Sequence, residues 1–336
     1  MGIDVAISIS VIIPSNHDYY ELLTIVKAVC CQTVRPNEIV IVDSSVQNSG
    51  CPREIMDLCK VNGIDLIYEH RVLALPGDAR NIGLKLANAE LFALIDVQTI
   101  PRPQWLEVSL SLLASSGTDT VWGAASFSAE KKFEMLVRDG FYGALLRKTL
   151  PGSVFRREVF SKTGQFVDWA RAGEDTEWML RVELLKFPVV SPSEALIDYV
   201  GLIDLSMKDL LKKWYRNYTA CRDLPHLFPQ RLLLWVVLYP LLILLAFNWN
   251  YLIADWRMDS PLYIGHVTKM VAIVPGVVYV LLRGLLLPLH RGVGIWRLLP
   301  TRFAAITLIC FMADVVKVLV FSIPKRKQNA KTHFLY

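Results

Sequence analysis

Three groups of carboxylates in this sequence have the residue types and the order needed for chemistry on a phosphorylated substrate. Asp43 and Asp96 each come directly after a short apolar run, and Glu174 and Asp175 follow Gly173 at the start of a segment with helical periodicity. Carboxylates are ligands that Mg2+ and Mn2+ prefer, and a carboxylate beside a hydroxyl can act as a general base. The pattern therefore predicts a site that holds a diphosphate through a cation and deprotonates a hydroxyl.

The elements that must position these residues alternate between strands and helices. Apolar or β-branched runs predict strands, and apolar residues at helical spacing predict helices. The expected strands are residues 7–13, 38–42, 64–68, 91–95, 120–127 and 187–190, and the expected helices are 19–31, 55–59, 78–89, 104–116 and 174–186. Residues 130–150 are expected to form a mixed segment over the site. Such alternation is typical of a doubly wound sheet, in which ligands bind beyond the carboxyl ends of the strands. Pro14, Asp43 and Asp96 fall at these ends.

The composition changes after about Arg231. The chain of 336 residues is 53% hydrophobic with a formal net charge of +5, and its mean hydropathy is +0.37. The apolar excess lies in the last third, which predicts a soluble domain followed by a membrane part. Basic residues lie beside the apolar segments without a nucleic-acid-binding motif, so we expect anionic headgroups and no nucleic acid as partners. The six scattered cysteines indicate neither a zinc site nor a disulfide framework.

Residues 205–231 have the pattern of an amphipathic helix that lies on a membrane surface. The residues expected to contact the surface or an acceptor there are Lys212, Lys213, Trp214 and Arg216. An ordinary packing helix is the alternative. In a later apolar segment, the side chain of Arg283 is expected to reach toward the interface.

Residues 232–254 and 268–289 are apolar and long enough to cross a bilayer. Residues 303–323 are expected to form a re-entrant or interfacial helix, or a third span, because Asp314 and Lys317 lie near the middle of the segment. These two residues are one helical turn apart and could pair. Two spans would return the later basic residues to the cytosolic side.

In this order and spacing the segments resemble the inverting family-2 glycosyltransferases of the GT-A fold, with a C-terminal membrane anchor. The resemblance covers roughly residues 8–190. It rests on the segments Ser10–Pro14, Ile41–Ser45, Gly77–Gly83, Ala89–Asp96, Phe155–Phe160 and Gly173–Asp175. It implies an α/β protein with a doubly wound mixed sheet, followed by interfacial and transmembrane helices.

The resemblance also implies roles for residues at the strand ends. The Pro14 loop and Asp43 correspond to positions that hold the base and ribose of the donor nucleotide, and Asp78, Arg80 and Asn81 are expected to bind the donor as well. Arg80 either neutralises phosphate, orients carboxylates or forms a structural ion pair with Asp78 or Asp96. A turn-forming role is the alternative for Asp43.

Asp96 matches the first residue of the family's metal-binding Asp-x-Asp motif, and Gln98 stands at the second position. A glutamine carbonyl can coordinate Mg2+ or Mn2+ but brings no charge, so we expect a weakened cation site. Asp175 matches the family's catalytic base, with Glu174 as its support or as an acceptor contact. The alternative for this pair is helix capping. Trp178 is expected to pack against an acceptor sugar or to fill the core.

The sequence therefore predicts a glycosyltransferase that moves one sugar from a UDP- or GDP-sugar to a polyprenyl phosphate or a polyprenyl-diphosphate oligosaccharide, in cell-surface polysaccharide or glycan assembly. A non-catalytic protein that binds nucleotide sugar or lipid and organises a membrane complex is the alternative. The expected parts are a transferase domain at 1–204, the interfacial region at 205–231, a membrane domain at 232–324 and a basic tail at 325–336. The catalytic domain is expected on the cytosolic face of a multi-pass protein, with the bacterial inner membrane as its location, and a homo-oligomer is left open.

Overall fold

The computed structural model describes residues 8–16, 19–224, 241, 244–245, 247–252, 257–263, 265 and 267–322. Within these residues, nine strands form one sheet with the order β3-β2-β1-β4-β7-β6-β9-β5, and β8 pairs with β6. The strands are β1 (Ile9–Ser15), β2 (Glu38–Asp43), β3 (Asp65–His70), β4 (Leu91–Leu94), β5 (Thr99–Pro101), β6 (Thr120–Phe127), β7 (Arg147–Arg156), β8 (Val189–Val190) and β9 (Ile197–Tyr199).

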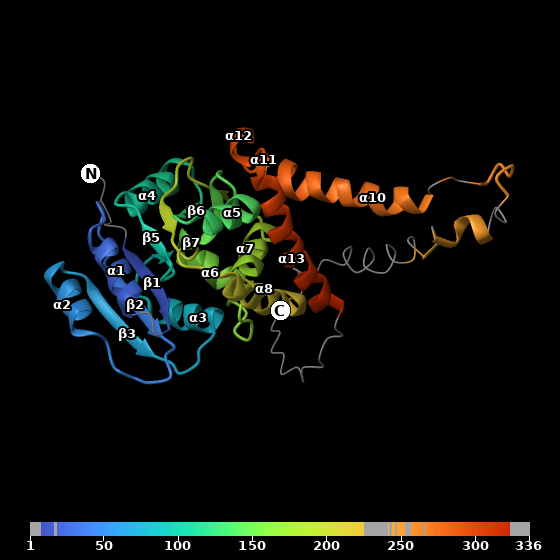
Figure 1. Cartoon of the computed structure of the whole chain (residues 1–336). Coiled ribbons are helices and arrows are strands. Elements are labelled where there is room, and N and C mark those ends of the chain that lie inside the picture. Colours follow the sequence, from blue (N-terminus) through green and yellow to red (C-terminus); the bar gives the residue numbers. More distant parts are fainter. Residues whose placement is uncertain are drawn as a thin grey trace.

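Helices cover both faces of this sheet (Figure 1). The helices of the sheet domain are α1 (Tyr19–Cys30), α2 (Arg53–Val61), α3 (Pro76–Leu86), α4 (Trp105–Ser115), α5 (Lys132–Val137), the π-helix η1 (Arg138–Tyr142), α6 (Arg157–Thr163) and α7 (Glu174–Leu184). Side chains of α1, α2 and α4 pack with Val11 and Ile13 of β1 in one core. Side chains of α3, α6 and α7 pack with Ile12 in the other. Successive residues of β1 thus face opposite layers, as the two-residue repeat of a strand requires.

The first four strands of the sheet order are parallel, and each of β1, β2 and β4 contains three or four consecutive apolar residues because both of its faces are buried. β7 then pairs antiparallel with both β4 and β6, which makes the sheet mixed. The expected doubly wound mixed sheet is confirmed. Residues 130–150, expected as a mixed segment, contain α5, η1 and the start of β7. The three-residue strands β5 and β9 are too short for an apolar pattern to predict.

The C-terminal region begins with α8 (Met207–Asp223), whose first residues are capped by Ser206 Oγ accepting from the Asp209 amide at 3.2 Å. The later elements are α10 (Val267–Val280), the π-helix η2 (Leu281–Leu286), α11 (Leu287–His290), α12 (Ile295–Leu298) and α13 (Arg302–Ser322). Figure 1 shows α10 projecting away from the sheet, whereas α13 packs against α8, η1 and α5.

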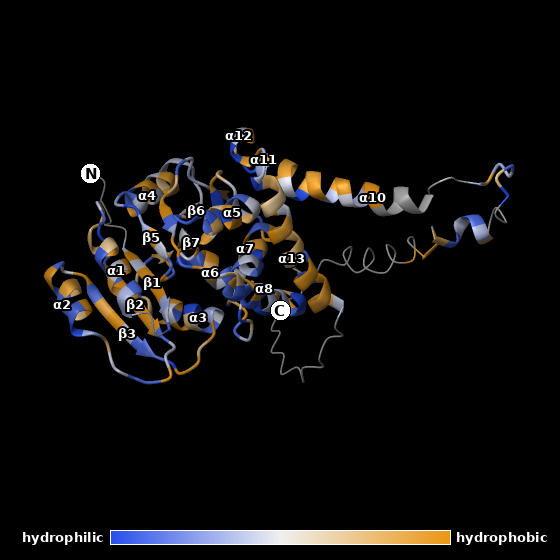
Figure 2. Cartoon of the chain, in the orientation of Figure 1, coloured by the Kyte–Doolittle hydropathy of each residue, from blue (hydrophilic) through white to orange (hydrophobic). Residues whose placement is uncertain are grey.

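Among the described residues, two stretches are apolar and long enough to cross a membrane by length and composition, Ile273–His290 and Arg302–Ser322. In Figure 2 the ribbons of α10 and α13 are mostly hydrophobic. Helices were expected at 268–289 and 303–323, and the structure has them there. Most of the other expected span, residues 232–254, lies outside the described residues, as does the basic tail at 325–336.

Two expectations for charged residues in these helices are wrong. Asp314 does not pair with Lys317, since its carboxylate accepts a hydrogen bond from the Tyr279 hydroxyl at 2.8 Å and lies 2.9 Å from the Arg283 guanidinium. Arg283 is therefore held against α13 instead of reaching toward an interface. Lys317 lies 5.9 Å from the ring of Tyr218 on α8. The geometric reason is that η2 and α13 pack side by side, which brings a closer partner to Asp314 than its own helix offers.

Candidate active site

The site lies at the carboxyl ends of the parallel strands, around the point where β2 and β4 flank β1 on opposite sides. Ser15 at the end of β1 is in register with Asp43 at the end of β2. The Asp43 carboxylate is 9% exposed and accepts hydrogen bonds from the Tyr68 hydroxyl at 2.8 Å and the Ser45 hydroxyl at 2.6 Å. A strand order that reverses at this place opens a crevice for a ligand. The Asp43 carboxylate is thus a hydrogen-bond acceptor held in a fixed position at the rim of this crevice.

A buried arginine joins the second and third carboxylate groups. Arg80 on α3 donates to Asp96, which follows β4, at 2.8 Å and to Glu174 at the start of α7 at 2.7 Å. The side chains of Arg80 and Glu174 are 4% and 5% exposed, whereas that of Asp96 is 33% exposed. The arginine therefore fixes two carboxylates whose positions in the chain are far apart, and only Asp96 of the three faces open space.

The electrostatics of this cluster leave an excess of negative charge. Burial disfavours the charge of Arg80, but the carboxylates of Asp96, Glu174 and Asp175 outweigh burial and raise its pKa. Burial raises the pKa of Glu174, although Arg80 opposes this shift. Glu174 Oε2 and Arg80 Nε are buried without a hydrogen-bond partner in the described residues. One guanidinium faces three carboxylates, so the cluster favours a further positive charge.

The start of α7 presents Asp175 beside this cluster. Gly173, the residue before α7, has φ of 87°, a left-handed conformation that glycine adopts without strain. Asp175 is half-buried, and its Oδ1 accepts from the Thr176 amide at 2.6 Å. No hydrogen bond to its Oδ2 is found among the described residues. Asp175 therefore has an oxygen that can take a proton from a substrate group.

Two predicted contact residues instead hold the loop that precedes α7. Asn81 donates to the Phe166 carbonyl at 2.9 Å and accepts from the Phe166 amide at 2.8 Å. Trp178 is fully buried, stacks on Phe166 and donates to the Gly164 carbonyl at 2.9 Å. The expected donor contact of Asn81 is corrected, because Asn81 is 2% exposed and both atoms of its side-chain amide are hydrogen-bonded to Phe166. Of the two expectations for Trp178, filling the core is confirmed.

Gln98 is hydrogen-bonded to Tyr199, a residue that the sequence did not single out. Its Oε1 accepts a hydrogen bond from the Tyr199 hydroxyl at 3.2 Å, and the same hydroxyl accepts from Lys213 Nζ at 3.0 Å. Burial raises the pKa of Tyr199 to about 12, so the phenol keeps its proton at neutral pH. The chain of contacts links the turn after β4 to α8. No local pattern marks Tyr199, because it lies on a three-residue strand.

The remaining predicted residues are placed as follows. Pro14 lies in β1, and Asp78 is half-buried in the first turn of α3. Lys212 and Arg216 are exposed on α8. Trp214 is 8% exposed and packs on Phe141, so its expected contact with membrane or acceptor is wrong. Trp214 lies on the face of α8 that packs against the rest of the protein.

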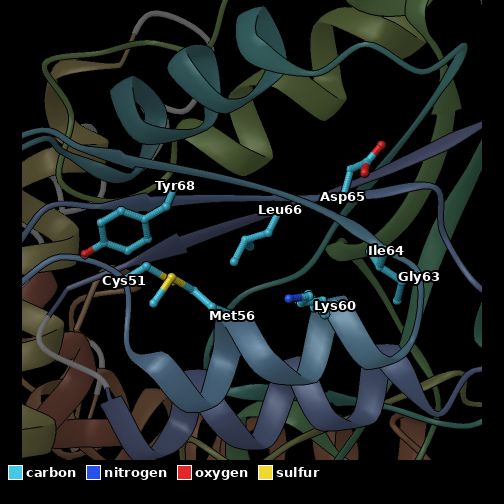
Figure 3. A pocket seen from close by; sticks show the side chains of 9 residues that line it. Cys51, Met56, Lys60, Gly63, Ile64, Asp65, Leu66 and Tyr68 are labelled. Carbon is cyan, nitrogen blue, oxygen red and sulfur yellow. The ribbon is translucent and has the colours of Figure 1, made fainter.

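A hollow of about 480 Å3 lies between α2 and β3 (Figure 3). Leu66 and Tyr68 of β3 face Met56 of α2 across it. Asp96, Glu174 and Asp175 do not line this hollow. Tyr68 is its link to the site, through the hydrogen bond to Asp43.

Known proteins resemble the part of the chain that carries this site. Residues 10–171 match the family model described as Glycosyl transferase family 2. Glycosyltransferase AglE of Haloferax volcanii is 22% identical over 184 residues, which cover 52% of this chain and 60% of that relative's length.

The fold is shared with the solved structure of a mannosyltransferase, and a second structure aligns less closely. The mannosyltransferase PcManGT from Pyrobaculum calidifontis, in complex with GDP-Man and Mn2+, aligns with a TM-score of 0.52 and 15% identity, covering 94% of this chain and 90% of that one. S. aureus TarS 1–349 in complex with UDP-GlcNAc aligns with a TM-score of 0.46 and 13% identity, covering 94% and 89%. The family match and the mixed sheet together show that residues 10–171 resemble a glycosyl transferase family 2 domain of the GT-A fold.

Proposed function

We propose that this chain is a membrane-anchored inverting glycosyltransferase that moves one sugar from a nucleotide diphosphate sugar to a lipid-linked acceptor, a polyprenyl phosphate or a polyprenyl-diphosphate oligosaccharide. The observation that carries this proposal is the cluster of Asp96, Arg80 and Glu174, with Asp175 beside it, at the carboxyl ends of the parallel strands. A family-2 domain accounts for the transfer chemistry. The apolar helices after it account for a lipid acceptor.

The donor nucleotide binds at the strand ends of β1 and β2 in this proposal. The Asp43 carboxylate, fixed by Tyr68 and Ser45, can accept hydrogen bonds from a base N–H or a ribose hydroxyl. Its low exposure favours binding because no side-chain ordering is needed when the ligand arrives. UDP- and GDP-sugars both offer such donors.

The residues present fit a divalent cation that is held mainly by the donor. The carboxylate of Asp96 is one-third exposed and lies in a cluster with excess negative charge. No group of three or more His, Cys, Asp or Glu side chains placed to hold an ion occurs among the described residues. Asp96 would be the charged protein ligand, and diphosphate and water oxygens would complete the shell. The cation would supply positive charge to the leaving diphosphate.

Asp175 is the proposed base. An acceptor hydroxyl that attacks the anomeric carbon must lose its proton, and a carboxylate on the side opposite the nucleotide can take it. Glu174 is too buried to meet an acceptor, so its role is to hold Arg80 in place between the two carboxylate groups. Arg80 in turn keeps Asp96 directed at the donor.

The exposed apolar surface of the C-terminal helices supports a membrane location. Large apolar side chains on α10, η2 and α13 are 44–60% exposed in the chain alone, including Ile273, Val277, Leu282, Leu308 and Leu319. A soluble protein rarely exposes so much contiguous apolar surface. We place the catalytic domain on the cytosolic side of the membrane, because its nucleotide-sugar donors are cytosolic.

The test is transfer of label from UDP- and GDP-sugars to polyprenyl phosphate and to polyprenyl-diphosphate oligosaccharide by the purified full chain in detergent or vesicles. Transfer by the parent chain is the expected result, with its loss in Asp175→Asn when the acceptor is the oligosaccharide, whose attacking hydroxyl must lose a proton. If no donor and acceptor pair reacts while nucleotide sugars still bind, the chain is a binding protein instead of an enzyme.

A further inference from the structure

A second hollow lies beside the start of α7, on the side that faces α8. Its volume is about 370 Å3, and it is lined by Trp169 and Arg171 from the loop before α7 and by Tyr215, Arg216, Thr219 and Asp223 from α8. Arg171 is four residues before Asp175 in the chain. One wall of the hollow is therefore formed by the loop that leads to the proposed base.

Two arginines, Arg171 and Arg216, line this hollow. Arg171 and Arg216 form no salt bridge within the described residues, and burial together with the nearby charge of Arg171 lowers the pKa of Arg216. The carboxylate in the lining, Asp223, pairs with Arg222 at 3.2 Å instead. Like charges held close together are unfavourable unless an anion lies between them, and guanidinium groups suit phosphate in particular.

Aromatic side chains complete the lining. Trp169 is 44% exposed and Tyr215 is 56% exposed. Neither ring is needed by the core, which makes them available to an apolar chain attached to the phosphate. Trp and Tyr are the residues that favour the boundary between bilayer and water.

We propose that this hollow, with Arg171 and Arg216 as its ligands, binds the phosphate group of the lipid acceptor, while Trp169 and Tyr215 contact the first part of its hydrocarbon chain. This inference rests on the proposed function, because it names the place at which that acceptor is held. It also separates the roles of two helix faces: Arg216 and Tyr215 bind the acceptor, whereas Trp214 packs inward.

The test uses geranyl phosphate as a soluble probe, with geraniol as the same chain lacking phosphate and inorganic phosphate as the same anion lacking the chain. Binding to the full-length protein in detergent is measured by calorimetry and by the fluorescence of Trp169, which Trp169→Phe identifies. Arg171→Gln and Arg216→Gln are each expected to weaken geranyl phosphate binding about tenfold, since each removes a charged hydrogen bond. Geraniol binding should be weak in every variant.

The matched control is Lys208→Gln, which removes one positive charge from the exposed face of the same helix without touching the hollow. Its binding of geranyl phosphate should equal that of the parent. Unchanged affinity in both arginine variants would overturn the proposal. An equal loss in Lys208→Gln would overturn it too, because the effect would then be general attraction.

A second arm uses transfer to a polyprenyl phosphate acceptor in phosphatidylcholine vesicles, with and without phosphatidylglycerol. The arginine variants should raise the acceptor KM in both vesicle types and leave the donor KM unchanged. A defect seen only with phosphatidylglycerol would show that the arginines contact bulk anionic lipid, against the proposal. If the parent transfers nothing but binds geranyl phosphate through both arginines, the proposed function fails and the lipid phosphate site stands.

Discussion

At the residue scale, the site depends on the buried guanidinium of Arg80 and on the different surroundings of the carboxylates. Arg80 contacts Asp96 and Glu174, but Asp175, the next residue in the chain, remains half-buried with one oxygen unoccupied within the described structure. Adjacent residues at the start of a helix point about 100° apart. One of them can therefore be structural while the other meets the substrate.

Asp175→Asn is expected to lower kcat by about 100- to 10,000-fold, the range of general base catalysis, when a sugar hydroxyl is the nucleophile. The donor affinity should stay within about twofold, because the change keeps the shape of the side chain. The measurement is kcat and donor Kd on the same preparation. A parallel loss of donor affinity would show that Asp175 contacts the nucleotide.

Gln98→Asp is expected to tighten Mn2+ binding in the presence of nucleotide diphosphate, because ligand charge raises the affinity for a hard cation. Calorimetric titration with Mn2+ checks this. Tyr199→Phe is the matched control, since it releases Gln98 Oε1 from its hydrogen bond without adding charge. Tighter binding in Tyr199→Phe alone would mean that availability of the oxygen, not charge, limits the site.

At the element scale, the loop between α6 and α7 positions the site, and the first turn of α3 packs tightly against this loop. A Cβ on Gly77 would lie 2.0 Å from the Val167 carbonyl oxygen, so the first turn of α3 and this loop leave no room for a side chain. Arg181 donates to the carbonyls of Thr163 and Gln165, each at 2.7 Å. The loop that ends at Gly173 is thus fixed at several points.

Gly173→Ala is expected to reduce both stability and kcat, because its φ of 87° costs a side chain about 1–3 kcal/mol and relief of that strain would shift Asp175. Gly63→Ala is the matched control, with φ of 67° and open space around its Cβ at the far end of α2. Thermal melting should show a similar loss for both variants, and transfer assays a loss for Gly173→Ala alone. Normal activity in Gly173→Ala would mean that the loop tolerates displacement.

A buried carboxylate also joins the start of β2 to the turn before β4. Glu38 is 6% exposed and accepts hydrogen bonds from the Ser10 hydroxyl and from the Asn88 amide at 2.5 Å. Burial raises its pKa, but these hydrogen bonds outweigh burial and hold the pKa below its ordinary value. Glu38 thus stabilises the fold above its unfolded-state pKa, and the contribution is lost as pH falls through its folded-state pKa.

Glu38→Gln is expected to lower the free energy of unfolding by about 1–3 kcal/mol at neutral pH, since an amide presents a donor to groups that donate. The difference from the parent should shrink as the pH is lowered, because the parent carboxylate is then protonated. Denaturant unfolding at several pH values measures this. A difference that does not change with pH would contradict the hydrogen-bonded carboxylate.

At the scale of the whole molecule, the apolar C-terminal helix α13 and the transferase domain share a core. Val137, Leu202 and Trp214 pack with Ile309 and Ala313 of α13 in one cluster. Asp139 of η1, which is 1% exposed, also pairs with Arg297 of α12 at 2.8 Å. The C-terminal helices therefore hold the transferase domain in a definite position instead of tethering it loosely.

A chain ending at Asp223 is expected to be less stable and more prone to aggregate than the full chain, because the apolar faces that α13 covers become exposed. Light scattering and thermal melting in detergent check this. A chain ending at Ser322 is the control, since it keeps α13. If the shorter chain stays monomeric and melts with the full chain, the helices are a simple anchor.

The sequence by itself determined the carboxylates and the strands that carry them. The buried runs before Asp43 and Asp96, and the glycine before Glu174 and Asp175, are local patterns, and each places its carboxylate at the end of an element. The helices at 268–289 and 303–323 were predictable for the same reason, since apolar length is a local property. The doubly wound sheet follows from the alternation of these elements.

Only the tertiary structure decided which side chains meet. Arg80 selects Asp96 and Glu174 over its near neighbour Asp78, Asp314 selects Arg283 over Lys317, and Tyr199 occupies Gln98. Each choice depends on the distances between elements that are far apart in the chain. A local sequence pattern contains no information about these distances. Burial likewise decided the roles of Asn81, Trp178 and Trp214. Their side chains turn toward loops and helices whose positions are set by packing.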